Sequence, residues 1–175
     1  MKSIKISILS FVLFSMLITS CNSSDPTGLI ADWKVKNDSY FANMKDSTDY
    51  VLYNIPASRG GNSFYYKVTT PGDQSSVSPL STDQVIVNYR GMLISGFVFD
   101  QTYSGTVIPT DGTPATFYAN QLIKGWTENL IQMKVGETRT IVLPQELGYG
   151  TAGAGSYIYP YSITIWVVQL VKVIR

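Results

Sequence analysis

Residues 85–91 read Val-Ile-Val-Asn-Tyr-Arg-Gly, and residues 163–174 read Ile-Thr-Ile-Trp-Val-Val-Gln-Leu-Val-Lys-Val-Ile. In the first segment the side chains fall into two alternating sets, Val-Val-Tyr and Ile-Asn-Arg, and this period of two is typical of a β-strand. The second segment is longer and rich in β-branched residues, which favour strands. Residues 138–143 have the same character and end before Pro144. We therefore predict a sheet in the C-terminal half of the chain.

One short helix is predicted between these strands. Ile123, Trp126, Leu130 and Met133 recur at the spacing of a single helix face, and Gly136 is well placed to end the helix. Many strands with a single short central helix favour the α+β class over an alternating parallel fold.

The segment that precedes this half also shows structure-forming patterns. A helix is predicted from Asp32, as its N-cap, to about Thr48, because the apolar residues there have helical spacing. Residues 59–62 read Arg-Gly-Gly-Asn and predict a turn, and residues 64–68 predict a strand.

The last strand poses a packing problem. If Trp166, Val168 and Leu170 face the helix, the opposite face of the strand is also apolar; it comprises Ile163, Ile165, Val167, Val171 and Val173. A sheet face this apolar is unusual in water. Our hypothesis is that the N-terminal extension covers it through three aromatic residues, Trp33, Phe41 and Phe64.

Composition excludes several classes of chemistry. The chain has 175 residues, no histidine and a single cysteine, Cys21. Serine–histidine and cysteine–histidine catalysis, zinc sites built on those ligands and internal disulfides are therefore excluded. The net charge is +1, and no basic patch argues for nucleic acid. We expect no cofactor and no metal site.

The N-terminus has the features of an export signal. Lys2 and Lys5 precede an apolar run, residues 6–18, which is short for a membrane span and suits the core of a signal peptide. It ends in Ile18-Thr-Ser-Cys21, which resembles a bacterial lipobox. That resemblance implies cleavage before Cys21 and lipid attachment to it; the alternative is an ordinary secretory signal. We predict a signal peptide over 1–20 and a lipidated tether over 21–31.

An ordered set of motifs carries a second resemblance. They are Tyr89-Arg-Gly91, Phe99-Asp100, Ile123-Lys-Gly-Trp126, Met133-Lys-Val-Gly136 with Pro144, and Tyr149-Gly150. Each is weak alone, but their order resembles the FKBP-type peptidyl-prolyl cis/trans isomerases. The resemblance covers residues 80–175, preceded by a helix and strand extension over 32–79. It implies an antiparallel sheet, here of about five or six strands, curved around one short helix.

The resemblance also implies the site. Asp100 at the pocket wall and the inward-pointing hydroxyl of Tyr149 are the expected catalytic groups, and the backbone N–H of Ile123 is a second candidate donor. Trp126 is expected to form the floor beneath the proline ring. The residues expected to bind substrate are Tyr89, Phe99, Ile123, Trp126, Ile158 and Trp166. For each there is a plainer alternative: Trp126 and Ile123 as core, Asp100 as a loop carboxylate, and Tyr149 as part of a turn.

Two departures from the family pattern concern the pocket rim. Tyr159 stands where a proline is usual, and Ala115 stands where an apolar aromatic often lines the edge. Substrate preference and the binding of macrolide inhibitors are the properties that these changes would alter.

Three functions follow as hypotheses. The first is an active prolyl isomerase that assists the folding of proline-containing, flexible polypeptides in a bacterial cell envelope, anchored to a membrane by lipid on Cys21. The second is a non-catalytic peptide-binding lipoprotein of the same fold, and the third is a scaffold. The joint presence of the pocket residues favours the first over the third. No segment suggests a coiled coil, so we expect a monomer.

Overall fold

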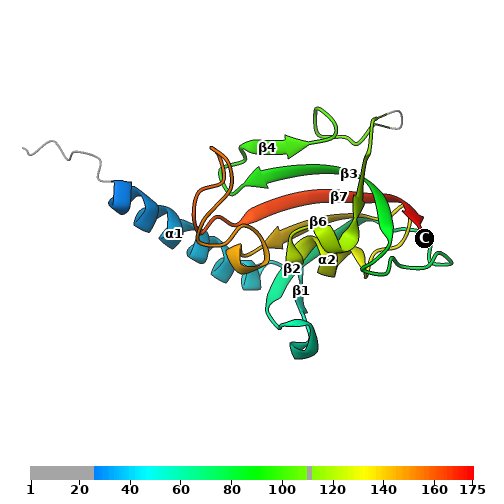
Figure 1. Cartoon of the computed structure of the whole chain (residues 1–175). Helices are drawn as coiled ribbons and strands as arrows, with labels where there is room; N and C mark the ends of the chain where they lie inside the picture. The colour runs from blue at the N-terminus through cyan, green and yellow to red at the C-terminus, as the bar shows by residue number, and fades with distance from the viewer. Residues whose placement is uncertain (1–25, 110–111) are drawn as a thin grey trace, which may run out of the picture.

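The computed structural model describes residues 26–109 and 112–175, so the predicted signal peptide and Cys21 lie outside the described residues. Within these two stretches the chain forms two α-helices and seven strands, with four short 3-10 helices between them (Figure 1). In chain order they are α1 (Pro26–Asn43), η1 (Met44–Asp46), β1 (Val51–Asn54), η2 (Ala57–Arg59), β2 (Ser63–Thr70), β3 (Gln84–Leu93), β4 (Val98–Gln101), β5 (Ala115–Tyr118), η3 (Ala119–Gln121), α2 (Lys124–Leu130), β6 (Thr138–Leu143), η4 (Gln145–Leu147) and β7 (Thr164–Ile174).

All seven strands belong to one antiparallel sheet. Its order is β1-β2-β6-β7-β3-β4, and β5 pairs with β3 as well. The predicted α+β class, with an antiparallel sheet, a short helix and an N-terminal helix, is confirmed. The sheet is larger than expected because β1, β4 and β5, each only four residues long, had no sequence pattern strong enough to predict them. The division predicted at residue 80 stays a prediction, and β2 crosses it by pairing with β6.

The predicted faces of the last strand need one correction. Trp166, Val168 and Leu170 lie in the inner core, as expected. A bulge at Val171 shifts the register against β3, so that Val173 pairs with Val85 and packs against the same inner core. The prediction that Val173 faces outward was therefore wrong, because an extra residue in one strand reverses the alternation beyond it.

The central helix is shorter than its apolar spacing suggested. It ends at Leu130, and the N–H groups of Gln132 and Met133 donate to the carbonyls three residues earlier, at 3.1 and 3.0 Å. These tight turns still carry Met133 into the core, where it is fully buried. Gly136 does not end the helix: it adopts a φ of 84° and donates its N–H to the carbonyl of Leu170 at 2.7 Å.

A close approach brings this helix onto the sheet. A Cβ atom on Gly125 would lie 2.5 Å from Cδ2 of Leu143, so only glycine permits this separation. The helix thereby seals one side of the inner core with Trp126 and Leu130. Figure 1 shows α2 lying across this face, opposite the side on which α1 packs.

The hypothesis that the N-terminal extension covers the outer face is confirmed in part: the extension packs around Ile163 and Ile165, whereas Val171 remains 38% exposed. Phe41 contacts Tyr65 edge to face at 5.1 Å, in a second apolar cluster formed by Tyr65, Val142 and Ile163. Trp33 lies farther along, and its indole N–H donates to the Ser162 hydroxyl at 2.9 Å. The expected contribution of Phe64 was wrong, because Phe64 faces the inner core and its neighbour Tyr65 faces outward.

The helix of this extension begins earlier than predicted. It starts at Pro26, a residue type that suits the first turn of a helix because its missing N–H would have no helical partner there. Asp32 therefore lies inside the helix and is not its N-cap, and the predicted tether over 21–31 overlaps the first turns. The glycine turn before β2 is confirmed, with positive φ at Gly60, Gly61 and Asn62.

One buried side chain fastens α1 to the sheet. Asn37 is fully buried, its amide donates to the carbonyl of Trp33 at 2.8 Å, and its Oδ1 accepts the N–H of Ile163 at 2.8 Å. The second bond satisfies a main-chain donor that would otherwise be buried without a partner.

We predict that Asn37→Ala lowers the free energy of unfolding by about 1–3 kcal/mol, because it leaves the N–H of Ile163 unsatisfied. Urea unfolding measures this loss. Ser39→Ala, at an exposed position of the same helix, is the matched control. Equal stability losses in the two variants would contradict the role assigned to Asn37.

Candidate functional site

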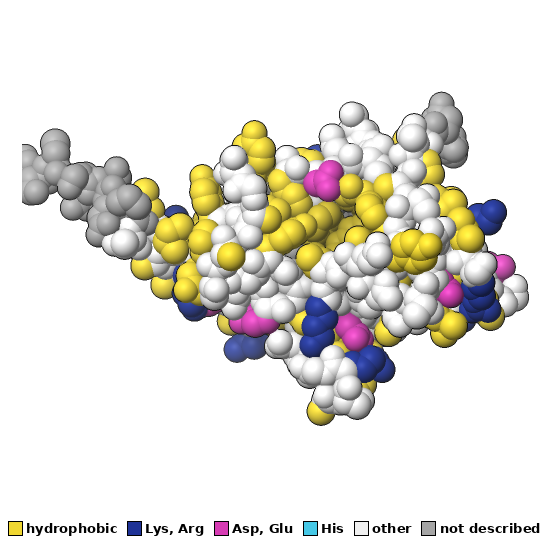
Figure 2. Space-filling view, in the orientation of Figure 1, with side chains coloured by type: hydrophobic (Ala, Val, Ile, Leu, Met, Phe, Trp, Pro, Cys, Tyr) yellow, Lys and Arg dark blue, Asp and Glu magenta, His cyan; other side chains and the backbone are white. Residues whose placement is uncertain are grey.

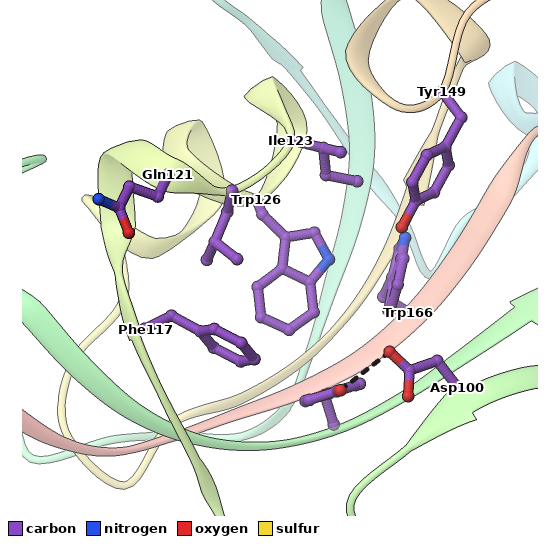
Figure 3. Close-up of a pocket in the computed structure, with 9 residues that line it drawn as sticks. Asp100, Phe117, Gln121, Ile123, Trp126, Tyr149 and Trp166 are labelled. Atoms are coloured by element: carbon purple, nitrogen blue, oxygen red, sulfur yellow. Dashed lines mark hydrogen bonds between the residues drawn. The ribbon is translucent and has the colours of Figure 1, made fainter. Parts of the chain in front are cut away.

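A hollow of about 260 Å³ opens on the inner side of the sheet, beside α2. Figure 2 shows it as an apolar depression with an acidic group at its rim. Its walls come from β3, β4, β5, β7, η3, the start of α2 and the loop after η4 (Figure 3). The lining residues are Tyr89, Asp100, Phe117, Gln121, Leu122, Ile123, Trp126, Tyr149 and Trp166.

The structure brings most of the predicted site residues together here. Six of the eight line the hollow, namely Tyr89, Asp100, Ile123, Trp126, Tyr149 and Trp166. Phe99 lies behind them, with its ring 5.0 Å from Trp166 and 6.5 Å from Tyr149. Ile158 is buried in its loop, where its main chain exchanges two hydrogen bonds with Ala154. It is not among the lining residues.

Three lining residues were not predicted. Phe117 lies on β5, a strand too short to be recognised, and Leu122 immediately precedes the predicted Ile123. Both side chains are apolar, as expected for this pocket, but nothing in the sequence distinguished them from core residues. Gln121, an exposed polar residue of η3, had no signal at all.

The floor of the hollow is a rigid set of aromatic rings around Trp126. This side chain is only 3% exposed and meets its neighbours edge to face, with Tyr89 at 5.3 Å and 85° and Trp166 at 5.1 Å and 89°. Phe117 completes the set at 6.5 Å and 82°. Edge-to-face contacts of this kind are preferred by aromatic quadrupoles, and they hold each ring in one orientation.

The two indole N–H groups differ in their partners. Trp166 donates to the Thr164 hydroxyl at 2.9 Å, which fixes its ring. The N–H of Trp126 is buried without a hydrogen-bond partner, and in Figure 3 it points toward the side of the hollow where Tyr149 and Trp166 lie. A buried donor without a partner costs free energy of folding.

A missing side chain makes room for this packing. Gly91 pairs with Trp166 across β3 and β7, and a Cβ atom there would lie 2.5 Å from Cζ3 of Trp166 and 2.8 Å from Phe99. Any larger residue would push both rings out of place.

The wall carries the polar groups. The hydroxyl of Tyr89 donates to a carboxylate oxygen of Asp100 at 2.9 Å, drawn as the dashed line in Figure 3. Burial raises the pKa of Tyr89 well above its ordinary value, and the bond to Asp100 raises it further. Burial also raises the pKa of Tyr149, with a smaller contribution from the charge of Asp100. Both phenols therefore stay neutral, as hydrogen-bond donors, at physiological pH.

The main chain adds a donor at the start of α2. The carbonyl of Ile123 accepts the N–H of Trp126 at 3.0 Å, whereas its own N–H precedes the first turn of the helix. Among the described residues no main-chain bond uses that N–H as a donor. Such orphan N–H groups are a general property of helix starts. The described residues also contain no group of three or more Cys, Asp or Glu side chains arranged to hold a metal ion.

Known proteins resemble this chain in both sequence and structure. The family model described as FKBP-type peptidyl-prolyl cis-trans isomerase matches residues 75–171. The peptidyl-prolyl cis-trans isomerase Mip of Coxiella burnetii is 42% identical over 112 residues, which are 64% of this chain and 45% of that protein. The outer membrane protein MIP of Legionella longbeachae is 34% identical over 140 residues, which are 80% of this chain and 54% of that protein.

The fold has solved counterparts as well. The crystal structure of FkpA from Escherichia coli superimposes with a TM-score of 0.68 at 32% identity, covering 85% of this chain and 62% of that one. The chain spans about half the length of the curated relatives it matches. Since the family model covers more than half of the sequence, the chain belongs to the FKBP-type peptidyl-prolyl cis-trans isomerase family.

Proposed function

We propose that this protein is a peptidyl-prolyl cis/trans isomerase that binds the twisted Xaa-Pro bond of flexible polypeptides in the hollow above Trp126. The observation that carries the proposal is the combination of a floor of rings in edge-to-face contact with two neutral phenols and one carboxylate in the same hollow. The relatives named above support the activity.

The reaction needs no covalent chemistry. Amide resonance opposes rotation with a barrier of about 18–20 kcal/mol, and an uncatalysed prolyl bond exchanges in roughly tens to hundreds of seconds. In the twisted transition state the resonance is lost, so the carbonyl is less polarised and the nitrogen becomes pyramidal. A surface that binds this twisted state more tightly than either planar isomer accelerates the rotation.

The lining residues have separate parts in this mechanism. The indole of Trp126 supports the proline ring, and the rings of Tyr89, Phe117 and Trp166 keep water from it. The hydroxyl of Tyr149 and the N–H of Ile123 donate to substrate carbonyls and hold the chain while the bond rotates. Asp100 accepts the hydrogen bond that orients the hydroxyl of Tyr89, and its carboxylate adds a negative charge at the edge of the hollow.

A second candidate is a peptide-binding module without catalytic activity. The aromatic lining of the hollow is compatible with this candidate too, because the same rings would bind a proline-containing peptide whether or not the bond rotates. Both candidates bind proline-containing peptides, but only the isomerase accelerates rotation of the prolyl bond, so a rate assay separates them.

A protease-coupled assay on short Xaa-Pro peptides tests the proposal with residues 22–175, which contain every described element. We expect this protein to accelerate the slow phase. Trp126→Ala should lower kcat/KM at least about 10-fold, and Tyr149→Phe about 5-fold through loss of one hydrogen bond. Asp100→Ala should lower it about 10-fold, because the hydroxyl of Tyr89 loses a charged acceptor.

Tyr118→Phe provides the control, since Tyr118 is exposed on the same short strand as Phe117 but does not line the hollow. Its rate should equal that of the unmodified protein. If no Xaa-Pro peptide isomerises faster, while peptides still bind and quench the fluorescence of Trp126, the binding module is the correct function.

We predict that kcat/KM is nearly constant between about pH 6 and 8. The chain has no histidine, and the raised pKa values of Tyr89 and Tyr149 move their ionisation to still higher pH. Rate measurements across this window in buffers of equal ionic strength give the profile. A bell-shaped profile there would show a titrating group that this mechanism lacks.

We infer that the protein works in the bacterial cell envelope, attached to a membrane by lipid on Cys21. The lipobox-like sequence before Cys21 supports the anchor, and the similarity to the outer membrane protein MIP of Legionella longbeachae supports an envelope location. Within residues 26–109 and 112–175 no helix is long and apolar enough to cross a membrane. Proline-containing polypeptides are the proposed partners, macrolides are candidate inhibitors of the same hollow, and a monomer is the proposed state.

Mass spectrometry of the full chain, purified from membranes of a bacterial host, tests the anchor. We expect a mature protein that starts at Cys21 and carries acyl chains, and Cys21→Ser should abolish both the added mass and membrane fractionation. Cleavage at another residue, or a mature protein without acyl chains, would establish the ordinary secretory signal instead.

A further inference from the structure

The apolar stripe by which α1 packs on the domain continues beyond the domain. On this side of α1, Asn37 and Phe41 contact the sheet or the loop that leads into β7, as does Met44, the first residue of η1. Ile30 and Trp33 continue the same stripe toward the N-terminus at helical spacing, with Leu29 beside them. Figure 1 shows that these first turns of α1 project past the edge of the sheet. Leu29 is 59% exposed as a result.

Aromatic side chains of two loops extend this surface. The ring of Tyr159 meets Trp33 edge to face at 6.1 Å, and Tyr157 packs on Phe97 of the β3–β4 turn at 5.1 Å. Tyr157, Tyr159 and Phe97 are all exposed. Two hollows, of about 470 and 270 Å³, lie on either side of the Trp33–Tyr159 pair. We call this surface the α1 aromatic surface; it comprises Leu29, Ile30, Trp33, Phe97, Tyr157 and Tyr159.

The chain itself indicates what lies against this surface. Pro26, the first residue of α1, is five residues after Cys21. Five residues span at most about 18 Å, whatever their conformation. A bilayer that holds acyl chains on Cys21 is therefore within reach of Leu29, Ile30 and Trp33 in the first turns of the helix.

The chemistry of the surface matches the interface of a lipid bilayer. Tryptophan and tyrosine concentrate at the level of the headgroups, where an apolar ring and a polar edge are both accommodated. The charges beside the larger hollow are balanced, since Lys36 and Asp32 both line it and Lys34 is paired with Asp38. This balance fits zwitterionic phospholipids and does not favour a strongly anionic surface.

We propose that the α1 aromatic surface lies in the headgroup interface of the membrane to which the protein is anchored, and so fixes the orientation of the domain. The proposal rests on the anchor at Cys21 proposed above. None of its residues lines the isomerase pocket, so that pocket stays open to polypeptides while the surface is occupied.

The test uses the single cysteine as a chemical tether. Residues 21–175 are coupled through Cys21 to a maleimide lipid in zwitterionic phosphatidylcholine vesicles, which makes attachment independent of lipidation in the cell. Brominated acyl chains then quench tryptophan fluorescence. We expect quenching that Trp33→Phe removes, because Trp126 and Trp166 are buried in the domain.

Two matched substitutions locate the contact on the helix. Leu29→Asp should reduce the quenching of Trp33 by at least about twofold, because it places a charge in the interface. Val35→Asp introduces the same charge at a residue of similar exposure, 63%, on the opposite side of α1, and should leave quenching unchanged. Circular dichroism checks that both variants keep the helix.

The possible results distinguish the docking of the α1 aromatic surface from the lipid anchor at Cys21. Absence of acyl chains on Cys21 in cells would refute the anchor, whereas the coupled protein still reports whether the surface meets the bilayer. No quenching of Trp33, or equal loss in Leu29→Asp and Val35→Asp, would overturn the docking. So would a dimer in solution that Leu29→Asp dissociates, since a second copy would then be the partner of the surface.

Discussion

The space left by Gly91 opposite Trp166 is the constraint on which the pocket depends. The antiparallel pairing of β3 with β7 sets these residues side by side, and the absent side chain lets the indole of Trp166 and the ring of Phe99 approach the sheet. Trp126 then stands edge-on to Trp166, at 5.1 Å, and forms the floor. A rigid floor matters for a reaction in which the enzyme must favour a twisted shape over a planar one, because a soft surface would accommodate both.

The same sheet has two apolar faces, and the chain covers them in different ways. The inner face is closed by α2, where Gly125 allows the helix to lie close to Leu143. Part of the outer face is covered by α1, which packs against the cluster of Tyr65, Val142 and Ile163, and Asn37 of α1 accepts the main-chain N–H of Ile163. The extension is thus a structural part of the sheet, and its two strands widen the sheet at the β6 edge.

This arrangement connects the pocket to the proposed membrane surface. The loop between Tyr149 and Ser162 begins at the pocket wall and ends where Trp33 donates to Ser162, and two of its tyrosines, Tyr157 and Tyr159, lie on the α1 aromatic surface. One loop therefore separates a site that needs access to polypeptides from a surface that would face lipid. Tyr159 contributes an aromatic ring of this loop to that surface.

Local patterns in the sequence determined the class of the fold, and the resemblance to a known family supplied most of the pocket residues. The alternation in residues 85–91, the β-branched run before Arg175 and the spacing of Ile123, Trp126 and Leu130 are properties of neighbouring residues, so they were readable without a structure. Asp100 and Tyr149 were expected in one site because the ordered motifs resemble a known family, and no pattern of neighbouring residues would have paired them.

Tertiary structure alone decided the rest. The bulge at Val171 turns Val173 toward the inner core. Phe64 faces the inner core, where the sequence had suggested the outer face. Four-residue strands such as β5 bring Phe117 into the pocket. Each of these depends on which strand lies alongside which and in what register. Such pairings are set by contacts between residues far apart in the chain, and no local pattern records them.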